Sequence, residues 1–149
     1  MEDPRPPRYA RLVYEVKNQV GKLVEIRLWS PVSAAEAVAW ARDHDSVVAA
    51  VGGPYVCLVD LFDAKVFPQD AVDAYTAVMQ AEPHLKRTGT LLSPSPTSAL
   101  QVRRMLRETD NPVRRAFTEV QPLLDWLDPV LTPLERARLR EALAERGRV

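Results

Sequence analysis

The most constraining feature of this 149-residue chain is a short apolar run from Val56 to Phe62, in which Asp60 is the one charged residue. The run is rich in β-branched and aromatic side chains and is too short for a buried helix, so it predicts a strand covered on both faces. Pro68, Gln69 and Asp70 then open an amphipathic helix. In α/β proteins the working surface usually lies where such a strand gives way to a helix, and the connecting loop is therefore the first candidate site.

Period-two alternation of apolar residues predicts two strands before this run, over about residues 12–17 and 23–29. A short turn over residues 18–21, which contains Gly21, joins them into an antiparallel hairpin with one wetter face. Short apolar segments over residues 88–93 and 113–120 predict two further strands.

Capping residues and helical spacing predict the helices. Ser33 and Glu36 form a capping box for the first helix, which runs to about residue 50. Further helices are expected over residues 68–81, from residue 96, and from residue 122. Thr132 and Glu135 form a second capping box, which opens a charged helix that ends near residue 146.

The resulting order, β-β-α-β-α-β-α-β-α with an added C-terminal helix, predicts an α/β fold. We expect a single-layer, mixed and mostly parallel five-stranded sheet with helices packed on it. Residues 1–8 are expected to be a disordered leader, residues 9–128 the domain, and residues 129–149 the charged helix. That helix has few apolar positions, so it should pack by a narrow seam, either on its own domain or on a second copy in a homodimer.

Net charge, apolar run length and cysteine content argue against several classes of protein. The net charge of +0 argues against a general binder of nucleic acid or anionic membranes. No apolar run approaches the roughly 20 residues that a membrane span needs, and the N-terminal residues lack the apolar segment of a signal peptide. The single cysteine, Cys57, lies in the apolar run, where it is expected to be a small core residue in a reducing compartment. We therefore expect a cytoplasmic protein.

Three segments carry a family resemblance: LVDL at residues 58–61, TGTLLS at residues 88–93, and VRRAFTEVQPLLDWL at residues 113–127. Following a hairpin in this order, they resemble the STAS-like domains of bacteria, the anti-sigma-factor antagonists and their SEC14-related relatives, over roughly residues 9–128. The resemblance implies a regulatory module with no enzymatic activity and no cofactor. Its partner would be another protein, of a kinase-like or sigma-regulatory kind.

The chain departs from the antagonists at one position. They carry a phosphorylated serine at the start of the helix after the central strand, whereas residues 67–70 here contain no Ser or Thr. One hypothesis is that Asp70 stands there as a fixed negative charge. The predicted partner-binding surface has Phe62 or Phe67 as its anchor, and its polar rim consists of Asp63, Lys65, Gln69 and Asp70. The alternative function is a small-molecule or lipid pocket between the sheet and its helices.

Two groups of polar residues have two interpretations each. Asp60, Asp63 and Asp70 could bind a divalent cation, but turn-forming and helix-start roles are favoured, so no metal is predicted. Ser95, Thr97 and Ser98 form either a capped turn or an anion-binding or modification site at a helix start.

No catalytic constellation is found in the sequence. His44 and His84 lie far apart in polar segments and are expected to be exposed, so the parts of an acid–base pair are not evident. Charge is uneven along the chain: residues 33–83 carry eight acids and two bases, and residues 86–115 carry seven bases and two acids. This pattern either steers a charged partner or forms ordinary solvated faces.

Overall fold

The computed structural model describes residues 13–29 and 32–149, so the predicted leader lies outside the described residues. Strands and helices alternate in the predicted order. The strands are β1 (Tyr14–Val20), β2 (Leu23–Leu28), β3 (Tyr55–Asp60), β4 (Leu85–Leu91) and β5 (Arg114–Phe117). The helices are α1 (Ala34–Val51), α2 (Gln69–Gln80), α3 (Pro96–Thr109), α4 (Val120–Leu127) and α5 (Pro133–Glu145), with a 3-10 turn η2 (Asp128–Val130).

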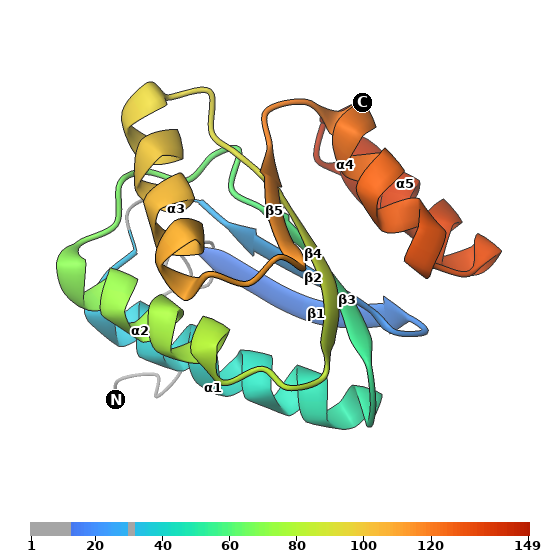
Figure 1. The fold of residues 1–149 in the computed structure, drawn as a ribbon, viewed down its shortest axis with the longest axis horizontal. Coiled ribbons are helices and arrows are strands. Elements are labelled where there is room, and N and C mark those ends of the chain that lie inside the picture. The colour runs from blue at the N-terminus through green and yellow to red at the C-terminus, as the bar shows by residue number, and fades with distance from the viewer. Residues whose placement is uncertain (1–12, 30–31) are drawn as a thin grey trace, which may run out of the picture.

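The five strands form one mixed sheet in the order β1-β2-β3-β4-β5, which confirms the predicted α/β class. β1 pairs antiparallel with β2, and all the other neighbours are parallel. Each parallel connection moves one strand further in the same direction, and such crossovers are right-handed, so α1, α2 and α3 share one face of the sheet. Figure 1 shows α4 and α5 on the opposite face.

β3 lies at the centre of the sheet, and its side chains alternate between two cores. Tyr55 and Cys57 belong to the core under α1, α2 and α3, whereas Val56 and Leu58 belong to the core under α4 and α5. None of the four is more than 1% exposed. The strand is therefore covered on both faces, as its apolar sequence predicts.

Two strands differ from the prediction at their ends. β4 begins at Leu85, before the expected residue 88, because Leu85 pairs with Tyr55 on β3. β5 ends at Phe117, so residues 118–120 do not extend the strand. Val120 instead begins α4, whose Leu123, Leu124 and Leu127 are buried against the sheet.

The hairpin prediction is wrong in one respect, because the face of β2 that was expected to be more exposed to water is mostly buried, with only Arg27 partly exposed on it. Glu25 on β2 is 0% exposed, and Leu23 belongs to the core under α4 and α5. This face of β2 is covered by α5, which packs on its own domain through a narrow seam of Leu139, Ala142 and Leu143. On this helix Leu134 remains 76% exposed.

Glu135 connects the start of α5 to the turn between β1 and β2 through hydrogen bonds. Its carboxylate completes the predicted capping box with Thr132 and accepts hydrogen bonds from the backbone N–H and the Nζ of Lys22, at 2.7 and 2.9 Å. A side chain on Gly21 would overlap this carboxylate, which explains the glycine at that turn. Burial would raise the pKa of Glu135, but the hydrogen bonds from Thr132 and Lys22 outweigh it and lower the pKa to about 2.

We predict that Glu135→Gln flattens the acid limb of the stability curve. The folded-state pKa of Glu135 lies below its ordinary value of 4.5, so its stabilisation is present above about pH 4.5 and is lost as the pH falls towards 2. The loss amounts to about 3 kcal/mol in wild type. Urea unfolding measured across this pH range should show a shallower decline for the variant, and parallel curves would contradict the assignment.

Candidate functional site

The loop that follows β3 is held rigidly at its two ends. At its start, Asp60 is 0% exposed and accepts a hydrogen bond from the Phe62 N–H at 3.0 Å, as a turn-forming aspartate does. At its end, Phe67 exchanges two backbone hydrogen bonds of 2.8 Å with the side-chain amide of Gln101 on α3. The loop therefore presents its side chains from a fixed backbone.

The predicted contact residues divide into exposed and buried groups. Asp63, Lys65, Gln69 and Asp70 are exposed, as a polar rim requires. Phe67 is 4% exposed, because its ring packs into the core edge-to-face with Tyr75 at a centroid distance of 5.2 Å.

Phe67 therefore supports the loop from inside and does not reach a partner directly in this conformation. The apolar groups that the loop exposes are Phe62, at 37%, and Val66, at 46%. The sequence does not predict Val66 as an exposed residue, because nothing in the local sequence distinguishes an outward valine from an inward one.

The acidic residues of the loop are paired with arginines. Asp63 accepts hydrogen bonds from Arg148 at 2.6 Å and from Arg27 at 3.2 Å, and these two partners lower the pKa of its carboxyl. The Arg148 guanidinium also lies over the Phe62 ring, 4.3 Å from its centroid. Residues that follow α5 therefore cover part of the loop.

Asp60, Asp63 and Asp70 do not converge on a shared cation position. Asp60 and Asp63 are bound by arginines, and Asp70 accepts a hydrogen bond from the neighbouring Ala71 N–H at 3.1 Å. Among residues 13–29 and 32–149 there is no group of three or more His, Cys, Asp or Glu side chains that could hold a metal ion. The arrangement fits the turn and helix-start roles.

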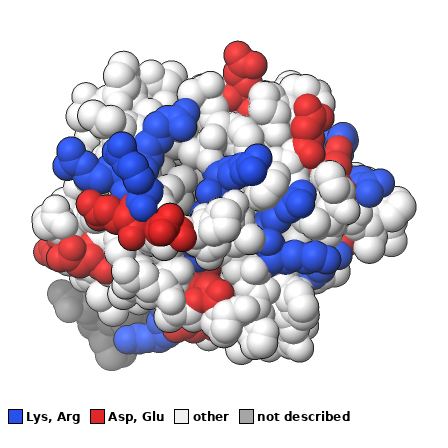
Figure 2. Space-filling view, in the orientation of Figure 1, with Lys and Arg blue, Asp and Glu red and all other residues white. Residues whose placement is uncertain are grey.

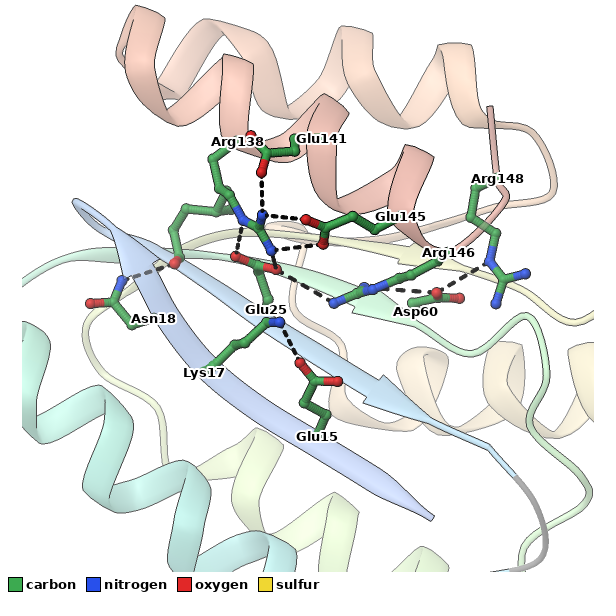
Figure 3. Close-up of polar contacts among 11 residues, drawn as sticks. Glu15, Lys17, Asn18, Glu25, Asp60, Arg138, Glu141, Glu145, Arg146 and Arg148 are labelled. Carbon is green, nitrogen blue, oxygen red and sulfur yellow. Dashed lines mark hydrogen bonds and ion pairs between the residues drawn. The ribbon is translucent and has the colours of Figure 1, made fainter. Parts of the chain in front are cut away.

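A buried ionic cluster fixes α5 and the residues after it to the sheet (Figure 3). Arg138 donates two hydrogen bonds of 2.8 Å to the Glu25 carboxylate, in the bidentate geometry that arginine favours for carboxylates. Arg146 lies 3.5 Å from Glu25 and 3.7 Å from Asp60, and Arg148 donates to Asp60 at 3.2 Å. Both carboxylates are 0% exposed, so they depend on these arginines for their charge partners.

The serine and threonine residues at the start of α3 are placed differently from one another. Ser95 and Thr97 are exposed, whereas Ser98 is 5% exposed and lies within the fold. The Ser95 side chain makes no capping hydrogen bond, and its N–H donates to the Ser93 hydroxyl at 3.1 Å. Of the three predicted residues, only Ser95 and Thr97 are accessible from solvent.

The prediction for His44 is wrong: the side chain is buried, with the residue 2% exposed. Its Nε2 lies 2.6 Å from Glu82, which also pairs with Arg114. Burial would raise the pKa of Glu82, but His44 and Arg114 outweigh it and lower that pKa. The inward position could have been found from helical spacing, since Ala37, Trp40 and His44 follow one another by three and four residues and are all buried.

The other two residues of catalytic interest are placed as the sequence predicts. His84 is exposed, and Cys57 is a buried free thiol. Burial raises the pKa of the Cys57 thiol well above its ordinary value, and a thiol that stays protonated is a poor nucleophile. Charged residues of both signs lie next to one another on the face shown in Figure 2, and neither sign dominates it.

The chain was compared with family models, curated proteins and solved structures. No family model matches the chain, and no curated protein matches it. Among solved structures, the chain is similar to the anti-sigma factor antagonist SpoIIAA in its unphosphorylated form, at 14% identity and a TM-score of 0.49. The match covers 80% of this chain and 99% of that one. None of the described helices is long and apolar enough to cross a membrane.

We predict that Arg138→Met destabilises the protein by about 3 to 5 kcal/mol, because it leaves Glu25 with a weakened charge partner inside the fold. The double variant Glu25→Met/Arg138→Met should recover most of this loss, since it removes both charges from the interior. Urea unfolding at neutral pH measures both effects.

Arg140→Met is the matched control on the same helix. Arg140 pairs with Asp128 at 2.7 Å, but its side chain is 46% exposed, so the loss should stay below about 1 kcal/mol. Equal losses for Arg138→Met and Arg140→Met would show that the buried pair has no special role.

Proposed function

We propose that this chain is a non-enzymatic regulatory module that binds another protein through the loop and helix start after β3. The proposal is supported by the pairing of two exposed apolar side chains, Phe62 and Val66, with a rim of charged and amide groups on a rigid backbone. Interfaces commonly combine such an apolar centre with a polar rim, and fixed side chains lose little entropy on binding.

The chemistry of the rim indicates what a partner would offer. Lys65 presents a cation beside Val66, and Asp70 presents a carboxylate at the start of α2. A complementary partner would have a shallow apolar pocket flanked by an acidic and a basic group. A kinase-like or sigma-regulatory protein is the class that the family resemblance suggests.

A groove next to the loop could extend this surface. It lies between the start of α2 and α3, has a volume of about 280 Å³, and includes Gln69 and Leu100 in its lining. Leu100 is 60% exposed and lies on α3 directly before Gln101, whose side chain binds the loop backbone. The proposed surface therefore consists of residues 62–70 and the adjoining face of α3.

We predict that Val66→Asp weakens partner binding by tenfold or more, because a charge at the centre of an apolar contact must be desolvated without a partner. The variant should fold normally, since Val66 is 46% exposed. Affinity capture from the native host, quantified by mass spectrometry, should show at least one protein that wild type retains and Val66→Asp loses.

Leu134→Asp is the control, because Leu134 is an even more exposed apolar residue in the first turn of α5. It should retain the same protein as wild type. Asp70→Asn tests the fixed-charge hypothesis separately, and unchanged capture would count against that charge. Identical sets of captured proteins for wild type, Val66→Asp and Leu134→Asp would overturn the proposed surface.

A further inference from the structure

A cavity of about 70 Å³ lies between the sheet and helices α1, α2 and α3. Most of its lining is apolar and comes from β2, β3, β4 and the three helices. Val78 and Met79 on α2 and Leu106 on α3 line it and are only half-buried, so the cavity approaches the surface between these two helices. A pocket between the sheet and its helices is the alternative that the sequence suggests.

Several residues that line this cavity carry buried polar atoms without partners. Eight buried side-chain nitrogen or oxygen atoms in the described ranges have no hydrogen-bond partner in the protein, and five belong to residues that line the cavity. The five are Trp40 Nε1, His44 Nδ1, Tyr75 Oη, Thr88 Oγ1 and Arg114 Nε. Each unpaired buried group costs about 1 to 3 kcal/mol, so five of them on residues of one lining require an explanation.

The unpaired groups favour a ligand that accepts hydrogen bonds. Trp40 Nε1 and Arg114 Nε can only donate, and the hydroxyls of Tyr75 and Thr88 can donate as well. Of the five, only His44 Nδ1 is restricted to accepting in a neutral imidazole, because its Nε2 faces Glu82 at 2.6 Å. Glu82 also lines the cavity and already pairs with Arg114, so its carboxylate balances the guanidinium and disfavours a second anion. An uncharged acceptor oxygen therefore fits this lining better than a carboxylate or phosphate does.

We propose that this cavity binds a small neutral molecule with a compact apolar body and a carbonyl oxygen. The oxygen would accept hydrogen bonds from donors among Trp40, Tyr75, Thr88 and Arg114, and the body would contact the apolar lining. Met79 and Met105 line the cavity, and their flexible side chains allow it to fit molecules somewhat larger than its present volume. The proposal rests on the lining of the cavity and not on the exposed side chains of the loop, although Phe67 belongs to both the loop and the lining.

Cyclopentanone is a suitable probe, and cyclopentane is its matched control without the oxygen. The chain has three tryptophans, so a ¹H–¹⁵N spectrum of the full chain contains three indole N–H signals. The Trp40 signal, assigned with Trp40→Phe, should shift saturably with cyclopentanone in the millimolar range. Trp126 does not line the cavity and its Nε1 already donates to the Thr88 carbonyl at 2.9 Å, so its signal should shift less than the Trp40 signal.

Two conservative variants test the donors. Tyr75→Phe and Thr88→Val each remove one unpaired hydroxyl, so each should weaken cyclopentanone binding about fivefold. Neither should destabilise the free protein, since the lost groups have no partner to lose. Tyr14→Phe is the control for the same chemical change away from the cavity, because the Tyr14 hydroxyl donates to Asp43 at 2.6 Å.

Several outcomes would overturn the proposal. An unmoved Trp40 signal would mean that the cavity takes no such molecule, and an equal response to cyclopentane would mean that the polar groups take no part. Tighter binding of isobutyrate than of cyclopentanone would replace the neutral ligand with an anion. Because these measurements use purified protein and leave Val66 unchanged, their failure would not affect the proposed partner surface.

Discussion

Two carboxylates with no access to solvent, Glu25 and Asp60, determine how one face of the sheet can be covered. Removing such an ion from water costs several kcal/mol, and the cost is recovered only when a well-placed cation and hydrogen bonds replace the solvent. Arg138, Arg146 and Arg148 supply those cations, and all three come from α5 or the residues after it. The C-terminal segment is therefore part of the sheet's own cover, although its sequence is mostly polar.

This dependence extends to the candidate partner surface. Arg148 binds Asp60 beneath the loop, binds Asp63 on the loop and lies over the Phe62 ring. The same residue thus joins the buried ionic cluster to the exposed end of the loop. From the other side, Gln101 holds the backbone of Phe67. The position of the loop is consequently set by two elements that are distant in sequence, α3 and the segment after α5.

Local signals in the sequence were sufficient for the fold. Apolar alternation located the strands, and the two capping boxes located the starts of α1 and α5, because each signal depends on residues a few positions apart. The buried pairs were not predictable in this way. Glu25 meets Arg138, and His44 meets Glu82, only after the sheet and helices are assembled. A sequence pattern identifies a charged residue but not the distant partner that allows it to be buried.

The outcome for Phe67 shows how the loop and the interior constrain each other. Leu61 and Phe67 line the cavity, whereas Phe62 and Val66, their immediate neighbours, are exposed. Inward and outward side chains therefore alternate along one short, fixed backbone. In a close-packed interior, a shift of the inward side chains must be passed to the backbone and so to the outward ones. The shape of the exposed surface thus depends on the packing around the cavity, because Leu61 and Phe67 connect the two.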